Sequence, residues 1–407
     1  MAVRTAKRSV VLMGTFDTKG RESAFLKGVL EKGGFHVITI DVGTGSRVNP
    51  LFVPDYSSEK VAEAAGKALD DVAALARQGK SQEWIGLMAR GAGRIVEELY
   101  AAGRLDGIIS FGGNAGTSLG TLVMRSLPFG VPKVMYSTVA SGNTRPYIGT
   151  KDICMIPSVA DIAGLNRITR TSLTKAAGAL MGMIMVGTPP ASDKPLIAMT
   201  EIGRLADNSP RIISRLEQEG YEVVLFHAVG TGGQALEDMI EQGLVRGLLD
   251  LSLNEVMDHL HGGFCDAGPG RLTAAAAKRI PTVVAPGYAN RIVFPSREAV
   301  PAKFSGREIW QMGVTLAIVP ASQDEMRQLA SVVAEKLNAY DGPLAVLLPM
   351  KGLSSPKERF DFPETNAVFF DELTRELKPA VRVKELDLHL LDEQFADEAV
   401  STLLEIM

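Results

Sequence analysis

Four polar side chains follow the first apolar run of the chain, at a place where they could bind a ligand. Residues 9–13 read Ser-Val-Val-Leu-Met, and residues 14–19 read Gly-Thr-Phe-Asp-Thr-Lys before a helical stretch. Ligands of open α/β sheets bind outside the carboxyl ends of the strands, and a helix start offers free N–H groups to an anion. The segment predicts one wall of a nucleotide-type site. Its candidate contacts are Thr15, Asp17, Thr18 and Lys19.

A glycine-rich loop after a second apolar run predicts a phosphate cradle. Residues 106–111 read Asp-Gly-Ile-Ile-Ser-Phe, and the loop follows at 112–118. Paired glycines let backbone N–H groups approach an anion closely, and Thr117 or Ser118 could cap a helix or bind a phosphate. The alternative is a tight turn without a ligand. The loop has neither the full dinucleotide-binding spacing nor the Gly-x-x-x-x-Gly-Lys-Ser/Thr signature. The candidate contacts are Gly112, Gly113, Asn114, Gly116 and Thr117.

Two further strand ends carry polar residues on the same expected edge. Asp41 and Thr44 follow the run at 35–41, and an acid in that position often binds a ribose hydroxyl. The alternative for Asp41 is a helix cap or a turn. Ser141 and Gly142 lie in a hydroxyl-rich loop after the run at 132–137, for which a solvated loop is the alternative.

The second half of the chain offers candidates for acid–base chemistry or anion binding. His227 ends an apolar run, and Gly-Thr-Gly-Gly-Gln opens a helix at 230–234, which is a good shape for an anion. Asp250 ends another run, and Arg291 suits a carboxylate or phosphate. The alternatives are a structural histidine, ordinary helix-start chemistry and a solvated loop. Together with Lys19, these three are the candidate catalytic residues.

Several kinds of site are not predicted. The segment 259–266 holds two histidines, a cysteine and an aspartate, but no partner pair elsewhere completes a zinc site. The two cysteines, Cys154 and Cys265, do not suggest a disulfide framework, and they fit a reducing cytosol. No Gly-x-Ser-x-Gly elbow or defensible Cys–His pair indicates a nucleophile.

Short Val/Ile/Leu runs alternate with longer amphipathic segments, which is typical of βα units around a parallel sheet. Three prolines within 186–195 predict a linker, so we expect domains at 1–187 and 194–407. Both read as Rossmann-like, doubly wound α/β domains, and a cleft between them is a natural ligand site. The predicted strands are 9–14, 35–41, 106–111, 132–137, 195–200, 222–227, 246–250, 281–285, 314–319, 343–348 and 381–385. The predicted helices are 19–33, 58–78, 91–103, 116–127, 159–184, 209–219, 232–242, 253–260, 269–279, 321–338 and 365–377.

Composition narrows the class of protein. The 407 residues are 46% hydrophobic and 22% charged, with a formal net charge of -4. That balance and the lack of Lys/Arg runs argue against a nucleic-acid partner. The N-terminus has no apolar signal core, and the apolar stretch 176–186 is too short to span a bilayer. We therefore expect a cytoplasmic protein without a membrane partner.

Six segments in order resemble a family of bacterial, fungal and plant proteins. That family is named for the N-terminal region of the tomato mosaic virus resistance protein, an inhibitor of tobamovirus replication that binds ATP. The resemblance covers about residues 8–400. The segments are Gly14–Lys19 with Glu22, Gly112–Thr117, Ser141–Asn143 with Tyr147–Gly149, Asp161–Asn166, His227–Gly233 and Leu249–Leu251.

The resemblance implies two Rossmann-like subdomains, a nucleotide site in the first, and self-association as a homodimer or higher homo-oligomer. The chain departs from the family pattern in three places. Asn143 stands where an acid is expected, and residues 200–211 and 310–312 differ from the usual segments. Antiviral activity belongs to a specialised plant member and is not carried over.

The leading hypothesis is an ATP-binding protein whose first domain holds the nucleotide. Asp17, Thr18 and Lys19 would contact phosphates or Mg²⁺, and the 112–117 backbone would cradle the phosphates. An alternative is an enzyme of small-molecule catabolism acting on an anionic substrate in the interdomain cleft. Another is a regulatory module whose bound nucleotide sets its oligomeric state.

Overall fold

A computed structural model describes residues 7–45, 51–187, 192–356 and 361–407. The chain forms two compact units, residues 1–190 and 191–407, and each is described by itself. The predicted linker at 186–195 includes residues 188–191, which lie outside the described residues. Both units are α/β domains with mostly parallel sheets, so the predicted fold class is confirmed.

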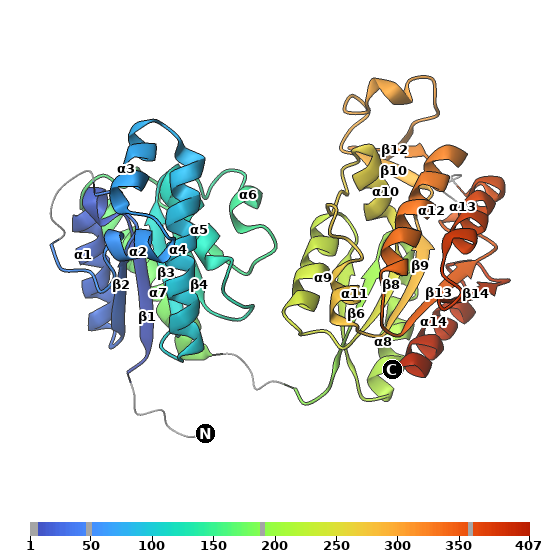
Figure 1. The fold of residues 1–407 in the computed structure, drawn as a ribbon, viewed down its shortest axis with the longest axis horizontal. Helices are drawn as coiled ribbons and strands as arrows, with labels where there is room; N and C mark the ends of the chain where they lie inside the picture. Colours follow the sequence, from blue (N-terminus) through green and yellow to red (C-terminus); the bar gives the residue numbers. More distant parts are fainter. Residues whose placement is uncertain (1–6, 46–50, 188–191, 357–360) are drawn as a thin grey trace. The chain divides into compact units, whose positions relative to one another are not determined.

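A five-stranded parallel sheet forms the centre of the N-terminal domain (Figure 1). Its strands lie in the order β2-β1-β3-β4-β5. They are β1 (Ser9–Gly14), β2 (His36–Asp41), β3 (Gly107–Gly112), β4 (Lys133–Ser137) and β5 (Cys154–Pro157). Almost every residue of β1 to β4 is buried, as expected for strands covered on both faces, whereas β5 is a half-exposed edge strand.

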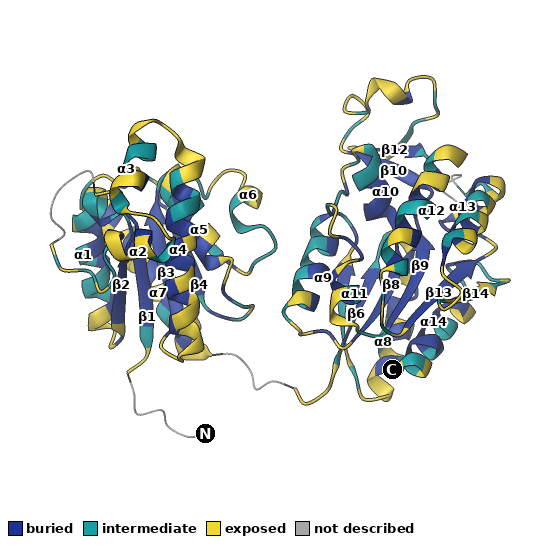
Figure 2. Cartoon of the chain, viewed as in Figure 1, coloured by how far each residue is buried: buried dark blue, intermediate teal, exposed yellow. Residues whose placement is uncertain are grey.

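Helices cover both faces of this sheet and create two separate apolar cores. The helices α1 (Phe16–Lys32) and α7 (Arg167–Val186) pack with one face. The other face packs with α2 (Ser58–Ala64), α3 (Leu69–Arg77), α4 (Ser81–Ala101) and α5 (Asn114–Met124). Figure 2 shows the consequence, with buried strands between helices whose outer sides are exposed. A short helix, α6 (Arg145–Ile148), lies in the loop between β4 and β5.

The C-terminal domain holds a six-stranded parallel sheet and a small antiparallel one. The large sheet has the order β14-β13-β9-β8-β6-β7, and the small one the order β10-β12-β11. The strands are β6 (Leu196–Glu201), β7 (Glu222–His227), β8 (Gly247–Ser252), β9 (Thr282–Gly287), β10 (Arg291–Phe294), β11 (Trp310–Met312), β12 (Leu316–Pro320), β13 (Leu344–Pro349) and β14 (Arg382–Leu386).

Within the described residues of this domain, seven α-helices cover the large sheet. One face packs with α8 (Ser209–Gln218) and α14 (Glu393–Ile406). The other face packs with α9 (Thr231–Glu241), α10 (Asn254–His261), α11 (Ala274–Lys278), α12 (Gln323–Asn338) and α13 (Pro363–Glu376). Two short 3₁₀ helices, Gly203–Asp207 and Ala302–Phe304, complete the described elements.

The structure corrects several predicted elements. The helix predicted at 58–78 is two helices, because Gly66 adopts a positive φ of 76° and ends the first. The helix predicted from 159 begins at 167, where Asn166 and Thr169 form a capping box. Asp161, at the start of the predicted helix, lies before the observed one and accepts a bond from the N–H of Ile162. Unpredicted elements are β5, α6, β10, β11 and α14.

Candidate functional site

The N-terminal sheet has a topological switch point between β1 and β3. The chain leaves β1 toward β2 on one side, and β3 continues toward β4 and β5 on the other. Met13 pairs with Ser110, so the loops at 14–19 and 112–117 leave adjacent strands about 4.8 Å apart at the same edge. Crevices at such switch points are the usual ligand sites of open α/β sheets. The segments 14–19 and 112–117 therefore flank the place where a ligand is expected.

The amino end of α5 offers unpaired N–H groups at this edge. The first intrahelical bond joins the N–H of Thr117 to the Gly113 carbonyl at 2.8 Å. The N–H groups of Asn114, Ala115 and Gly116 precede it and have no acceptor among the described residues, and no side chain caps the helix. Asn114 and Ala115 are exposed, so an anion can reach these donors.

The two glycines before α5 have different roles. A Cβ on Gly112 would lie 2.9 Å from the Cα of Gly116, so only glycine fits there. A Cβ on Gly113 would have Thr138 Oγ1 as its nearest neighbour, at 3.7 Å, which is ordinary contact. Gly112 thus serves the fold, whereas the space beside Gly113 is open.

Two polar side chains of the predicted cradle are already engaged. The Thr117 hydroxyl is buried and lies 2.6 Å from Ser137 Oγ. Asn114 Oδ1 accepts a bond of 2.9 Å from the Tyr147 hydroxyl, which ties α6 to the start of α5. The backbone, rather than the Thr117 side chain, is therefore the available anion-binding group.

A cavity of about 630 Å³ lies beside the α5 start, and we call it the polar hollow. It is lined by Thr138, Ser141, Pro157, Ser158, Val159, Ala160 and Asp161. These residues follow β4 and β5, so the polar hollow lies at the carboxyl edge of the sheet. Thr138 lines the polar hollow and also faces Gly113, so the hollow lies next to the glycine loop before α5. Ser141 and Gly142 were both predicted as contacts; Ser141 lines the polar hollow, whereas the N–H of Gly142 donates to the Val139 carbonyl in a turn.

Val159 is a backbone outlier on the rim of the polar hollow. Its φ is +65°, which a β-branched residue rarely adopts, and its side chain is 84% exposed. Strained residues of this kind cluster at ligand sites. The sequence gives no signal for it, because valine normally favours extended backbone.

Lys19 anchors a wall of this site in the structure. Its Nζ donates to the Ile162 carbonyl, and Glu22 Oε1 accepts the N–H of Gly164 at 2.5 Å. Both bonds hold the 158–166 loop against α1, whose helical geometry is interrupted at Lys19 (φ -123°, ψ 28°). Lys19 would have to leave the Ile162 carbonyl to bind a phosphate.

Two carboxylates lie near the ends of β1 and β2. Asp17 Oδ1 is buried and has no hydrogen-bond partner among the described residues, and a Cβ on Gly43 would lie 2.6 Å from it. Asp41 Oδ1 accepts the N–H groups of Phe16 and Gly43 at 3.0 and 2.9 Å. Burial raises the pKa of Asp41, with a smaller contribution from the Asp17 charge. Asp41 therefore stabilises the turns after β1 and β2, as the turn alternative predicted. Asp17 Oδ1 stays without a hydrogen-bond donor among the described residues.

Three predicted threonines, Thr15, Thr18 and Thr44, follow the same two strands, β1 and β2. The Thr15 and Thr18 hydroxyls lie 2.9 Å apart at the start of α1. Thr44 is half-buried and follows Gly43.

Asp250 belongs to a buried ion cluster in the C-terminal domain, in which both of its carboxylate oxygens accept hydrogen bonds. The Arg271 guanidinium donates to both Asp250 oxygens at 2.6 and 2.7 Å, to Glu255 at 2.8 Å and to Glu237 at 3.3 Å. Arg271 and Asp250 are 1% and 0% exposed. The sequence did not predict a role for Arg271, because a lone arginine between glycine-rich segments resembles a surface residue.

The second glycine loop is occupied by a carboxylate of the protein itself. Glu255 Oε1 accepts the N–H groups of Gly230 and Gly233 at 2.7 and 2.9 Å. Burial raises the pKa of Glu255, although Arg271 and the two N–H groups lower it. The anion-binding shape predicted at 230–234 is therefore real, but its anion is Glu255.

The other two candidates of this domain are not among the described hydrogen-bond partners of the Arg271 guanidinium. His227 is exposed at the end of the edge strand β7. Arg291 is buried, and its guanidinium lies 4.4 Å from the centre of the Tyr288 ring. A catalytic group built from His227, Asp250 and Arg291 is not supported.

The buried carboxyl of Asp258 should make the stability of the C-terminal domain depend on pH. Its oxygens accept the N–H groups of Val293 and Cys265, and burial raises its pKa to about 7. A carboxyl whose pKa is raised on folding stabilises the protein fully below the unfolded value near 4 and loses that stability as pH rises toward 7. We expect Asp258→Asn to gain about 2 kcal/mol relative to wild type between pH 5 and pH 8. Chemical denaturation at both pH values measures this, and a constant difference would contradict it.

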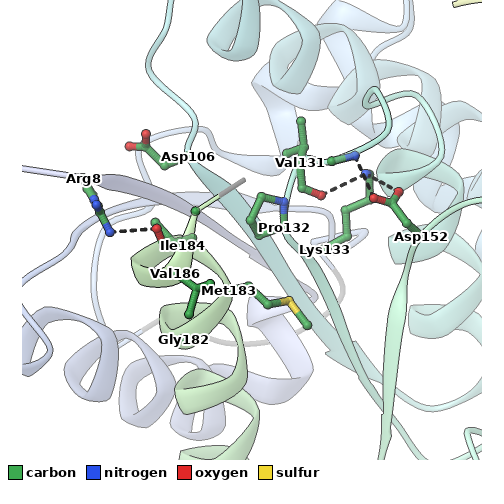
Figure 3. Close-up of a pocket in the computed structure, with 12 residues that line it drawn as sticks. Arg8, Asp106, Val131, Pro132, Lys133, Asp152, Gly182, Met183, Ile184 and Val186 are labelled. Atoms are coloured by element: carbon green, nitrogen blue, oxygen red, sulfur yellow. Dashed lines mark hydrogen bonds and ion pairs between the residues drawn. The ribbon is translucent and has the colours of Figure 1, made fainter. Parts of the chain in front are cut away.

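A second cavity of the N-terminal domain lies at the opposite edge of the sheet. It measures about 720 Å³ and includes Arg8, Asp106, Lys133 and Asp152 in its lining. Figure 3 shows Arg8 bound to the Ile184 carbonyl, and Lys133 bound to the Val131 carbonyl and Asp152. These residues lie near the amino ends of β1, β3 and β4 or the end of α7. Although it is larger, its cations bind acceptors of the chain itself, so the carboxyl edge is the better candidate.

Comparison with known families agrees with the two units. The N-terminal domain of the uncharacterised protein family UPF0261 matches residues 8–189, and its C-terminal domain matches residues 194–407. The chain belongs to this family. Its relatives include a UPF0261 protein of Clostridium tetani, 37% identical over 405 residues, which cover 98% of this chain and 99% of the relative.

A plant relative is also similar over nearly the whole chain. The ToMV resistance protein Tm-1(GCR237) of Solanum lycopersicum is 32% identical over 426 residues, covering 98% of this chain and 55% of the plant protein. The family resemblance found in the sequence is thereby confirmed.

Comparison with solved structures finds only weak likenesses. A Staphylococcus aureus MnaA–UDP structure is 13% identical, with a TM-score of 0.21, and covers 69% of this chain and 79% of its own. Such a likeness carries no information on ligand or activity. Within the described residues, no helix is long and apolar enough to cross a membrane. The same residues contain no group of three or more His, Cys, Asp or Glu side chains arranged to hold a metal.

Proposed function

We propose that the N-terminal domain binds a nucleoside triphosphate, ATP, with its phosphates at the amino end of α5. The observation that carries this proposal is the set of three unpaired N–H groups at 114–116, which open beside the polar hollow at the carboxyl edge. Such donors and the helix dipole favour an anion. The family resemblance, which implies ATP in the first domain, supports the same choice.

Asp17 fits the role of a Mg²⁺ ligand. Magnesium prefers oxygen ligands and is often held by one or two carboxylates together with substrate phosphates. Asp17 Oδ1 is buried without a partner among the described residues, which costs free energy unless a cation or donor occupies the place beside it. Bound Mg²⁺ would neutralise phosphate charge, while Thr15 and Thr18 would bind phosphate oxygens or water.

The Asp17→Asn variant tests this arrangement. We expect ATP affinity in the presence of Mg²⁺ to fall roughly tenfold, or about 1.4 kcal/mol, because an amide is a poor magnesium ligand. Isothermal titration with Mg²⁺ and with EDTA measures it, and in EDTA the variant should match wild type. Asp70→Asn, on the exposed side of α3, is the control. Equal Mg²⁺ dependence in Asp17→Asn and wild type would remove Asp17 from the site, and absence of ATP binding by wild type would refute the proposed function.

The other functions considered from the sequence receive no comparable support. The cluster around Arg271 engages Asp250 and weakens the case for a catabolic enzyme. Binding of a small anionic substrate, self-association and a cytoplasmic location stay predictions.

A further inference from the structure

A second hollow adjoins the polar hollow on its outer side, and we call it the apolar groove. It measures about 540 Å³ and lies between the edge strand β5 and the first turns of α7. It is lined by Ile156, Pro157, Val159, Arg167, Ile168, Thr171, Ser172 and Lys175. Its apolar side chains are unusually open to solvent, since Val159 is 84% and Ile168 51% exposed.

The two hollows share a wall. Pro157 and Val159 line both of them. Val159, held at a positive φ, therefore stands on the ridge between a polar space and an apolar one. A ligand with an anionic part and a flat apolar part would fill both, and such a ligand explains why an exposed valine is kept in a strained conformation.

We propose that the apolar groove holds the nucleobase of the ligand whose phosphates bind at α5. Only β4 separates β3 from β5, and α5 and α7 cover opposite faces of the sheet, so the distance from the α5 start to the groove runs over the carboxyl edge of the sheet. A ribose with its phosphate chain can bridge that distance through the polar hollow. The faces of the base would pack on Val159 and Ile168, which would remove their apolar surface from water.

The groove also offers polar groups for the edge of a base. The Thr171 hydroxyl donates to the Arg167 carbonyl, which leaves its oxygen as an acceptor for a base amine. Lys175 is an exposed cation at the same groove and can donate to a ring nitrogen. The Tyr136 hydroxyl lies 2.7 Å from Ser172 Oγ and 3.4 Å from the Ser158 carbonyl, which fixes α7 against the wall of the polar hollow. The groove is thus held in place by bonds within the domain.

The inference rests on the proposed function, and the test separates the two. Wild type and Ile168→Ala are titrated with Mg-ATP and with magnesium tripolyphosphate, which has no base. We expect Ile168→Ala to bind ATP roughly fivefold more weakly and tripolyphosphate as wild type does. Leu244→Ala, which truncates a leucine of 41% exposure in the C-terminal domain, should leave both affinities unchanged.

Each outcome bears on one of the two claims. If wild type binds neither ligand, the proposed function fails and this inference with it. If wild type binds ATP but Ile168→Ala changes both affinities equally or neither, the base lies elsewhere and only the inference is overturned. The same follows if sedimentation shows a wild-type dimer that Ile168→Glu dissociates without loss of ATP affinity, because a second copy would then cover the groove.

Discussion

Replacing Arg271 with methionine is expected to destabilise the C-terminal domain by about 3–5 kcal/mol. The guanidinium is 1% exposed and is shared by Asp250, Glu255 and Glu237. Methionine fills a similar volume but leaves three carboxylates without their cation. Asp250 is the most affected, because both of its oxygens accept from Arg271 and it is fully buried. Urea denaturation measures the loss of stability. Hydrogen exchange should show that the loss of protection is confined to residues 194–407.

A surface arginine provides the matched control for this prediction. Arg211 also makes two bonds to one carboxylate, at 2.8 and 2.7 Å from Asp397, but it is exposed. Arg211→Met should leave stability close to that of wild type, because exposed ion pairs are screened by water. Equal effects of the two substitutions would show that the Arg271 cluster does not hold the domain together.

Gly113→Asp is expected to lower ATP affinity roughly 100-fold while the protein stays folded. The backbone at Gly113 (φ -80°, ψ -158°) suits any residue, and its Cβ position is free of close contacts. An aspartate there would cap α5 by accepting from the N–H groups that the phosphates need. It would also set a negative charge against the ligand. Calorimetric titration measures the affinity, and thermal denaturation shows whether the fold is intact.

Ala68→Asp adds the same charge at another helix start. Ala68 is the exposed N-cap of α3, has extended backbone and makes no capping bond. Capping should raise stability by about 1 kcal/mol without changing ATP affinity. If Gly113→Asp retained wild-type affinity, the phosphates would not lie at α5.

The sequence was sufficient to predict much of the architecture. Alternating apolar runs and turn residues predicted the buried strands, since each short apolar run ends at a polar or glycine-rich loop. The edge strands β2, β7 and β14 were predicted, whereas β5 was missed because its apolar run, Ile-Cys-Met-Ile at 153–156, is short and is half-exposed in the fold. The helix α14 was not predicted, although its buried residues, among them Phe395, Ala399 and Leu403, recur at helical spacing.

The candidate site was predicted only in outline. The strand-end loops at 112–117 and 137–143 could be placed at one edge because parallel strands share their carboxyl ends. The hydrogen-bond partner of each side chain could not be predicted. Lys19 binds a carbonyl 143 residues away, and the Thr117 hydroxyl pairs with that of Ser137 at the end of the neighbouring strand. The same reason hid Arg271, whose three acids come from different elements. Long-range pairing of this kind leaves no periodic trace in a single sequence.

A crystal structure of the full chain with Mg²⁺ and a non-hydrolysable ATP analogue tests the central claim most directly. The account predicts phosphate density within hydrogen-bond distance of the N–H groups of Asn114, Ala115 and Gly116, with the metal at Asp17. Phosphate density at the amino edge of the sheet, in the cavity beside Arg8 and Lys133, would contradict it.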